Sequence, residues 1–155
     1  MEKDLLLIGA GKMGTALIQG WLSKGISKNN ITIIEPNEIN SSKLIDLGLK
    51  VFDSLVGFDK LIKQSVIVLA VKPQIIESVA VELKDVMIDH NVILSIAAGV
   101  KLEFLNKCIG NNTAIVRAMP NTPAQISAGI TVLCKNSFCS DDDVNITNEL
   151  MSSVG

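Results

Sequence analysis

The sequence predicts one doubly wound α/β domain, with a mainly parallel sheet and helices on both faces of that sheet. Three observations support this fold class. The 155 residues suit one domain of ordinary size. Short, continuously apolar segments alternate along the chain with longer amphipathic ones. Continuous hydrophobicity is typical of strands covered on both faces, and the strand–helix alternation is typical of parallel sheets with right-handed crossovers.

The expected strands are the short apolar runs, each bounded by Gly, Pro, Asn or charged residues. They are 5–8, 31–34, 66–71, 92–96 and 114–116, with 129–134 as one further candidate. The expected helices, which show apolar residues at helical spacing, are 13–24, 38–47, 74–86 and 102–109. A last helix is expected from Ser140, an N-cap residue followed by three aspartates, to about residue 152. Residues 119–124, with two prolines, are expected to form a loop.

Composition excludes several classes of protein. The net charge is −2 and Arg117 is the only arginine, which argues against a nucleic-acid binder. The apolar runs are far shorter than the ~20 residues of a membrane-spanning helix, and the N-terminus has no basic region or cleavage site of a signal peptide. Three widely spaced cysteines favour reduced thiols in a cytoplasmic protein. A single histidine, His90, does not make a zinc site, so no metal is expected.

The sharpest local signal is the glycine-rich turn Gly9-Ala10-Gly11-Lys12-Met13-Gly14, between the first expected strand and the first expected helix. In this context Gly9 permits the tight turn, Gly11 lets the backbone approach a pyrophosphate, and Gly14 lets the helix pack closely on the sheet. The N–H groups at the helix start favour negative charge. The turn therefore predicts dinucleotide binding and a Rossmann-type fold.

Glu35 ends the second expected strand, 21 positions after Gly14, close to the ~20 expected for an acidic residue that binds the ribose hydroxyls. A carboxylate there would repel a 2′-phosphate, so the sequence favours NADH over NADPH. The alternative is a solvated strand end without a ligand.

Three further segments are expected at the carboxyl ends of the strands, where ligands bind in open α/β sheets. They are Ala70-Val71-Lys72-Pro73, Ala97-Ala98-Gly99 and Met119-Pro120-Asn121. The prolines stiffen the last of these, which suits an amide held against a ligand; ordinary turn chemistry is the alternative. Arg117 lies just before it, and an ion pair with an acidic residue is the favoured interpretation. The alternative is that it anchors the loop or a substrate carboxylate.

Together these segments resemble the N-terminal domain of pyrroline-5-carboxylate reductase. The resemblance is carried by the glycine-rich turn, by the Val-Lys-Pro segment and by residues 95–100, 117–124 and 150–155, in order along nearly the whole chain. It implies reduction of the cyclic imine 1-pyrroline-5-carboxylate to L-proline with NAD(P)H, in proline biosynthesis.

By that resemblance the glycine-rich turn holds the pyrophosphate and Glu35-Pro36-Asn37 meet the adenosine ribose. Residues 70–73 and 97–99 would line the path to the nicotinamide, with Met119-Pro120-Asn121 on the nicotinamide and substrate side. No catalytic residue is assigned. Family members often carry Ser or a basic residue in place of Glu35, which leaves NADP open.

The family also implies a helical C-terminal domain that forms the dimer and contributes to the imine site, and whose Ser-Gly-Ser-Gly-Pro-Ala signature is not found in these 155 residues. Residues 1–155 are accordingly expected to be the dinucleotide-binding domain, monomeric and inactive or weakly active alone. The alternatives are the cofactor domain of another two-domain dehydrogenase, such as a 3-hydroxyacid or prephenate dehydrogenase, or a dinucleotide-binding module without chemistry.

Overall fold

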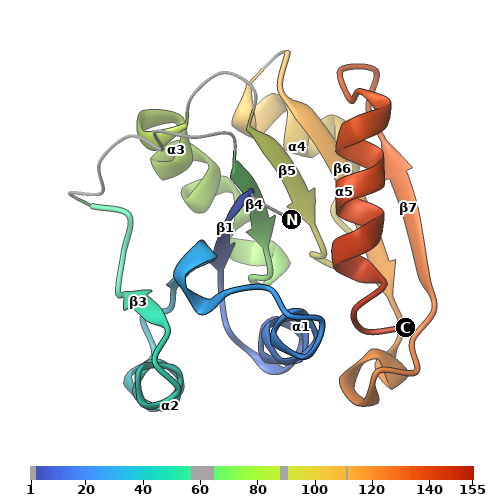
Figure 1. Cartoon of the computed structure of the whole chain (residues 1–155). Helices are drawn as coiled ribbons and strands as arrows, with labels where there is room; N and C mark the ends of the chain where they lie inside the picture. The colour runs from blue at the N-terminus through green and yellow to red at the C-terminus, as the bar shows by residue number, and fades with distance from the viewer. Residues whose placement is uncertain (1–2, 57–64, 88–90, 111) are drawn as a thin grey trace.

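A computed structural model describes residues 3–56, 65–87, 91–110 and 112–155 (Figure 1). His90 lies outside the described residues. The strands are β1 (Asp4–Ile8), β2 (Ile31–Ile34), β3 (Lys50–Phe52), β4 (Ser65–Leu69), β5 (Val92–Ser95), β6 (Ala114–Pro120) and β7 (Thr131–Lys135). The α-helices are α1 (Lys12–Ser23), α2 (Glu38–Asp46), α3 (Ile76–Val86), α4 (Leu102–Ile109) and α5 (Asp141–Met151). Short 3-10 helices are η1 (Lys28–Asn30), η2 (Pro73–Ile75) and η3 (Thr122–Ile126).

The described strands form one sheet in the order β3-β2-β1-β4-β5-β6-β7. Every neighbouring pair is parallel except β6 and β7, which are antiparallel. The chain leaves β1 toward one side of the sheet and returns at β4 on the other. This reversal beside β1 is the switch point at which open α/β sheets bind ligands. The predicted doubly wound, mainly parallel fold is confirmed.

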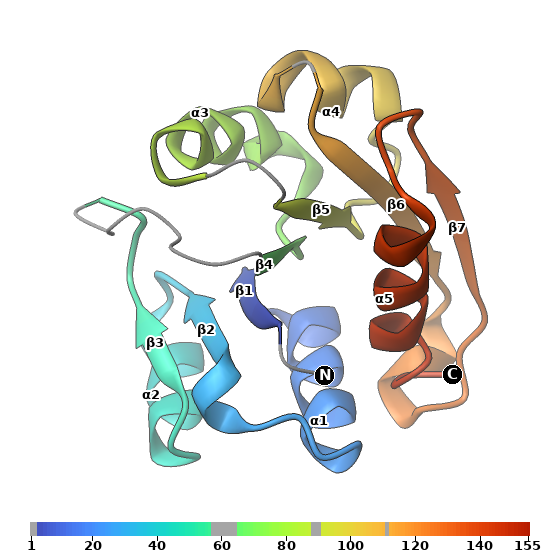
Figure 2. The same ribbon diagram turned by 45° about the horizontal axis from the view of Figure 1, so that its top comes forward.

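Alternate residues of each strand feed two separate hydrophobic cores. Leu5 and Leu7 of β1 belong to the core beneath α1, α2 and α5. Leu6 and Ile8 belong to the core beneath α3 and α4. Figure 2 shows these two helical layers on opposite faces of the sheet. Because both faces of the central strands are covered, these strands are almost continuously apolar, which explains the apolar runs in the sequence.

The main differences from the sequence prediction are one additional strand, β3, and changed bounds around β4, α3 and β6. β3 was not predicted, because Lys50–Phe52 is a short edge strand that pairs only with β2. β4 ends at Leu69, so Ala70 and Val71 follow the strand. A 3-10 turn at η2 comes before α3, because Pro73 occupies its first position. β6 continues to Pro120 through its pairing with β7, so the predicted loop at 119–124 begins later.

The last helix and the residues that follow it pack against the first helix. Ser140 caps α5 in a capping box with Asp143, as the N-cap prediction required. After α5 the chain turns against α1, where Trp21 Nε1 donates to Leu150 O at 3.1 Å and Lys24 Nζ to Ser152 O at 2.8 Å. Trp21 is fully buried and packs the first helix into the core. None of the described helices is long and apolar enough to cross a membrane.

Candidate dinucleotide-binding site

Two glycines of the glycine-rich turn are required by the fold itself. Gly9 has φ +92°, and a Cβ there would lie 2.7 Å from Ala70 O. A Cβ on Gly14 would overlap the carbonyl oxygen of Gly9. Any side chain at either position therefore collides with backbone, and at Gly9 it also meets an unfavourable dihedral angle. These positions are explained without a ligand.

Gly11 is different, because nothing in the fold requires glycine there. It is the N-cap of α1 with φ −67° and ψ −163°, which any residue adopts. A Cβ at Gly11 would find no atom within 4 Å. Ser, Thr, Asp or Asn would be the stronger N-cap, yet α1 has no side-chain cap. The glycine leaves the N–H groups of the first helical turn accessible to a ligand, which is the arrangement that a pyrophosphate needs.

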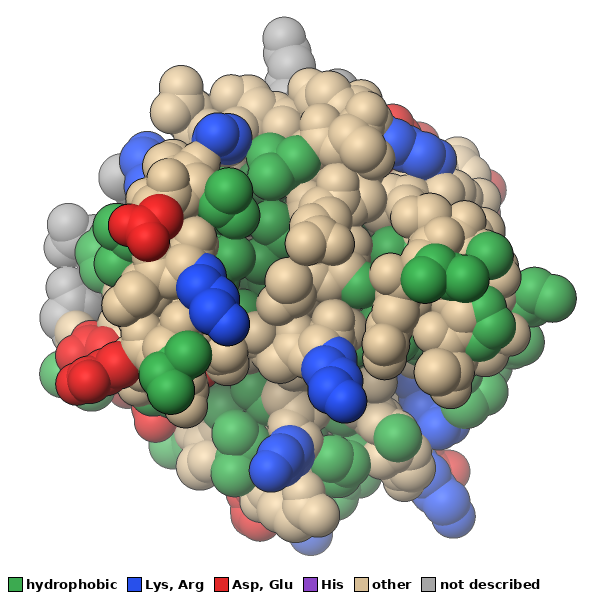
Figure 3. Space-filling model, turned by 90° about the horizontal axis from the view of Figure 1, so that it is seen from below, with side chains coloured by type: hydrophobic (Ala, Val, Ile, Leu, Met, Phe, Trp, Pro, Cys, Tyr) green, Lys and Arg blue, Asp and Glu red, His purple; other side chains and the backbone are tan. Residues whose placement is uncertain are grey.

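A surface hollow of about 540 Å³ lies in front of this turn. It is lined by residues from the turn, from α1, from α2 and from η3: Ala10, Gly11, Lys12, Thr15, Ala16, Gln19, Asn40 and Gln125. Figure 3 views the molecule from this edge, where lysine or arginine side chains lie near the centre and acidic ones lie toward the margin. This distribution favours an anionic ligand such as a dinucleotide.

Five residues that line the hollow were not predicted, and one of them, Ala16, is apolar and offered no signal. Thr15 and Gln19 carried a weak signal, because polar residues four apart near a helix start share one face. Asn40 lies in the first turn of α2, and its N–H donates to Asn37 Oδ1 at 3.1 Å. Gln125 carried no local signal, since it reaches the hollow only through the return of η3 against α1.

Glu35 connects the end of β2 to the glycine-rich turn. Its Oε2 accepts from Ala10 N–H at 2.7 Å and its Oε1 from Asn37 N–H at 2.9 Å. Gly9 N–H also donates to Ile34 O at 2.9 Å. Glu35 is only 7% exposed. The alternative of a solvated strand end is therefore wrong: a buried carboxylate holds the turn from behind.

The segments after β4 and β5 lie at the same edge as the turn. Ile8, Leu69, Ser95 and Arg117 are neighbours in register across four strands. The residues that follow, 70–73 and 97–99, therefore leave the sheet side by side. Ala97 is buried, with its N–H 3.4 Å from Ser95 Oγ, whereas Lys72, Pro73, Ala98 and Gly99 are exposed.

The predicted segment Met119-Pro120-Asn121 is brought to this edge, but in another form. Met119 and Pro120 are strand residues paired with Val132 and Thr131. Asn121 closes the β6–β7 connection, since its Oδ1 accepts from Ile130 N–H at 2.8 Å and its own N–H donates to Ile130 O at 3.2 Å. The side-chain oxygen expected to meet a ligand already has a partner within the protein.

Arg117 does not form the expected ion pair. Among the described residues it has neither an ion pair nor a hydrogen bond, and its Nε is fully buried without a partner. The favoured interpretation of a structural ion pair is therefore wrong. Acidic side chains are not found on β5, β6 or β7, so the sheet offers none next to it.

The three cysteines are free thiols, as predicted. Burial raises the pKa of the Cys108 thiol, with a smaller contribution from Glu77. Burial is also the main cause that raises the pKa of Cys139, aided by Asp143. Both are therefore poor nucleophiles at neutral pH. Among the described residues, no group of three His, Cys, Asp or Glu could hold a metal ion.

Comparison with known families agrees with this geometry. The family described as "NADP oxidoreductase coenzyme F420-dependent" matches residues 4–99, which contain the glycine-rich turn, Glu35 and the Val-Lys-Pro segment. The chain belongs to this family. Its members are NAD(P)-dependent oxidoreductases.

Individual relatives extend the similarity to the whole chain. Pyrroline-5-carboxylate reductase of Haemophilus influenzae is 35% identical over 154 residues, which are 99% of this chain and 56% of the relative. A solved pyrroline-5-carboxylate reductase from Coxiella burnetii has a TM-score of 0.92 at 30% identity and covers 100% of this chain, which spans 57% of it. The Plasmodium falciparum pyrroline carboxylate reductase, solved with NADP bound, has a TM-score of 0.83 at 28% identity, with coverage of 99% and 56%. The family member described here thus spans a little over half the length of these relatives.

Proposed function

We propose that residues 1–155 are the dinucleotide-binding domain of a pyrroline-5-carboxylate reductase, which reduces 1-pyrroline-5-carboxylate to L-proline. The observation that carries the proposal is Gly11, a glycine at a helix N-terminus that opens onto the hollow and for which the fold has no steric use. Similarity to reductases along the whole chain supports the choice of reaction. The three free thiols support a cytoplasmic protein.

In this proposal each segment at the carboxyl edge has a binding role. Gly9, Ala10, Gly11, Lys12, Met13 and Gly14 hold the pyrophosphate. Glu35, Pro36 and Asn37 meet the adenosine ribose, and 70–73 with 97–99 line the path to the nicotinamide. Met119, Pro120 and Asn121 lie on the substrate side. When bound, the reduced nicotinamide supplies the hydride; the chain's own residues bind and orient its carrier.

We further propose that the chain prefers NADH to NADPH because of Glu35. The carboxylate is buried beside the turn, so its charge is poorly screened there. A 2′-phosphate on the adenosine ribose would meet that charge, whereas a ribose with two hydroxyls could donate to it. The NADP bound to the Plasmodium relative shows that the other cofactor suits at least one protein of similar fold.

Calorimetric titration with NADH and NADPH tests cofactor binding, and the same sample is then assayed for imine reduction. We expect measurable binding with little or no turnover, because the chain spans only 56% of the Haemophilus relative. Gly11→Ala should weaken binding by about tenfold or more, which is about 1.4 kcal/mol, with an unchanged melting temperature. Ser27→Ala, at the N-cap of η1 at the opposite edge of the sheet, is the control and should bind like the parent.

Two outcomes would contradict the proposal. Absence of binding for both cofactors would remove the interpretation of the glycine-rich turn. Full imine reduction by the 155 residues alone would show that they are more than a cofactor domain.

The cofactor preference is tested by the ratio of the two dissociation constants. Glu35→Ser should bring the NADPH-to-NADH ratio down toward one or below, because the repelling charge is lost. The ratio is needed because the variant also loses the bonds to Ala10 and Asn37, which lowers both affinities. Tighter binding of NADPH than NADH by the unaltered chain would overturn the charge argument.

A further inference from the structure

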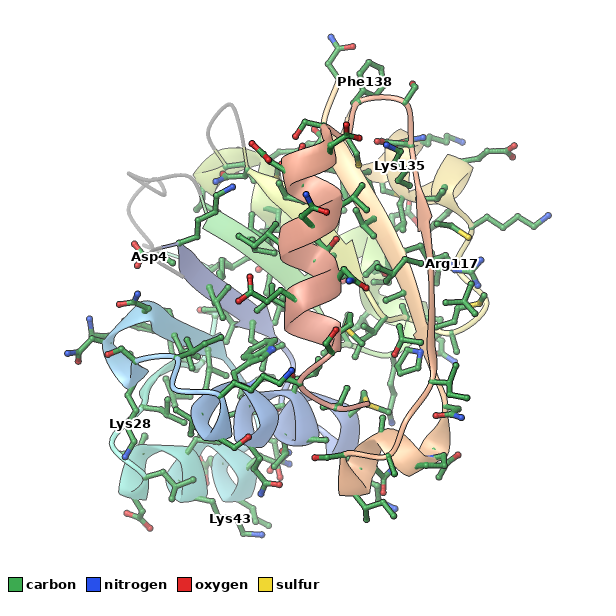
Figure 4. The ribbon with its side chains drawn as sticks, turned by 45° about the vertical axis from the view of Figure 1, so that its right-hand side comes forward. Asp4, Lys28, Lys43, Arg117, Lys135 and Phe138 are labelled. Atoms are coloured by element: carbon green, nitrogen blue, oxygen red, sulfur yellow. The ribbon has the colours of Figure 1, made fainter. Side chains whose placement is uncertain are left out.

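Arg117 is the only arginine of the chain and lies in the middle of β6 (Figure 4). Its strand neighbours in register are Ser95 of β5 and Cys134 of β7. Ile115, two residues earlier, is buried in the core beneath α3 and α4, whereas Val116 belongs to the opposite core. Because side chains alternate along a strand, Arg117 is on the α3 and α4 face.

The guanidinium on that face is half-buried but unpartnered. Of its three nitrogens only Nε is fully buried without a hydrogen bond, so the two terminal nitrogens reach the surface. Burying part of a cation without an acceptor is costly, and most buried polar groups are paired. The buried carboxylate of Glu35 shows the usual solution, with a hydrogen bond to each oxygen.

The surroundings of Arg117 also lack a cover. On the same face Met119 is 41% exposed, Val132 is 54% exposed and Cys134 is exposed. α4 packs on β6, whereas among the described residues the main helix contact of the outer strand β7 is with α5, on the other face. The guanidinium is thus the one described cation set into a largely apolar strip of sheet. Arg117 lies level with the carboxyl ends of β1, β4 and β5 and three residues before the end of β6.

We propose that Arg117 is a binding site for a single carboxylate that the described chain does not supply. The planar fork of a guanidinium matches the two oxygens of a carboxylate, and one cation balances one such charge. Two sources share this chemistry: the carboxylate of a small substrate at the carboxyl edge, or an acidic side chain of a polypeptide segment that covers β6 and β7. Naming the first source rests on the proposed function, but the site itself does not.

A single arginine makes the test direct, because the Nε–H of Arg117 gives one arginine side-chain signal in a nitrogen-15 correlation spectrum. We would titrate the 155-residue chain with sodium acetate, with L-proline, and with sodium chloride at matched ionic strength. We expect a saturable shift of the signal with acetate that chloride does not produce. Equal half-saturation by acetate and L-proline assigns the site to an acidic side chain; at least tenfold tighter binding of L-proline assigns it to the substrate.

Two variants separate this role from a structural one. Arg117→Met should leave the melting temperature unchanged or raise it, because the native cation has no partner to lose. Arg117→Lys keeps the charge but not the fork, and should lose most of the rise in melting temperature that acetate gives the parent. A signal that moves alike with acetate and chloride, or a drop of several degrees in Arg117→Met, would overturn the proposal. Calorimetry with NADH tests the dinucleotide site separately, so the two proposals can fail independently.

Discussion

The two ends of the sheet's ligand edge are built in opposite ways. At the glycine-rich turn, the backbone N–H groups of Gly9, Ala10 and Asn37 and both oxygens of Glu35 have partners within the chain. At β6 and β7, Arg117 Nε and Thr131 Oγ1 are the described buried side-chain atoms without a hydrogen bond. The second region also exposes large apolar side chains, among them Ile130 at 71% and Val132 at 54%.

This difference indicates that the glycine-rich turn is a preformed site, whereas the β6–β7 face has groups that still lack a partner. The turn already has the shape in which it would bind a dinucleotide, so binding there needs little reorganisation. The β6–β7 face has unpartnered polar atoms and exposed apolar side chains, and no described residue pairs with the former or covers the latter. Substitutions should therefore lower the free energy of unfolding strongly at the glycine-rich turn and only slightly at β6 and β7.

The largest expected effect is at Gly9. Gly9→Ala should cost about 1–3 kcal/mol of unfolding free energy from backbone strain, and a similar amount from overpacking against Ala70 O. Val132→Ala, on the exposed face of β7, should stay within about 0.5 kcal/mol. Urea unfolding of both variants measures the two costs. Equal losses would break the contrast between the regions.

The next effect compares the buried carboxylate of Glu35 with the half-buried guanidinium of Arg117. Glu35→Gln should lose about 1–3 kcal/mol, because an amide cannot accept from both Ala10 N–H and Asn37 N–H in the same geometry. A matched unfolding curve of Arg117→Met should show no loss. If the methionine variant were the less stable of the two, Arg117 would have a partner that the contrast denies it.

A smaller effect is expected at Asn121, where the β6–β7 connection is held by hydrogen bonds within the chain. Asn121→Ala removes the acceptor of Ile130 N–H and should cost about 1 kcal/mol, since the group is exposed and water can replace part of the bond. Calorimetric melting of this variant, compared with Ser42→Ala at an exposed position of α2, gives the difference. A loss as large as that of Glu35→Gln would show that the β6–β7 connection is as rigidly held as the turn.

The smallest effect concerns thiol chemistry. Cys134, exposed on β7, should react first with iodoacetamide at pH 7.5, and the fast phase should vanish in Cys134→Ser. The raised pKa values of Cys108 and Cys139 keep these thiols protonated, so their labelling should become appreciable only as pH rises above the ordinary thiol range. The same shifts predict that stability is kept at neutral pH and falls as pH rises through that range. Fast labelling of all three at neutral pH would contradict this order.

Sequence reasoning succeeded where the signal is local. The glycine-rich turn, the cap at Ser140 and the apolar strands depend on neighbours only a few residues away. The sequence did not predict hydrogen bonds such as the one from Ala10 N–H to Glu35 Oε2, 25 positions apart, because spacing alone does not give side-chain orientation. The isolation of Arg117 was missed for a related reason: pairing depends on where acidic residues fall in space. Gln125 joins the hollow only through tertiary packing.

The brace between Trp21 and the last residues has a consequence for how the chain acquires its structure. The bond from Trp21 Nε1 to Leu150 O joins positions 129 apart, and Lys24 meets Ser152 across 128. Contacts this distant slow folding, because a long loop must close before they form. During synthesis, the glycine-rich turn and the helix α1 that follows it are made first. This helix gains its contacts with residues 150–152 only after those residues have left the ribosome. The proposed cofactor site should therefore mature late, although the sequence that specifies it is translated first.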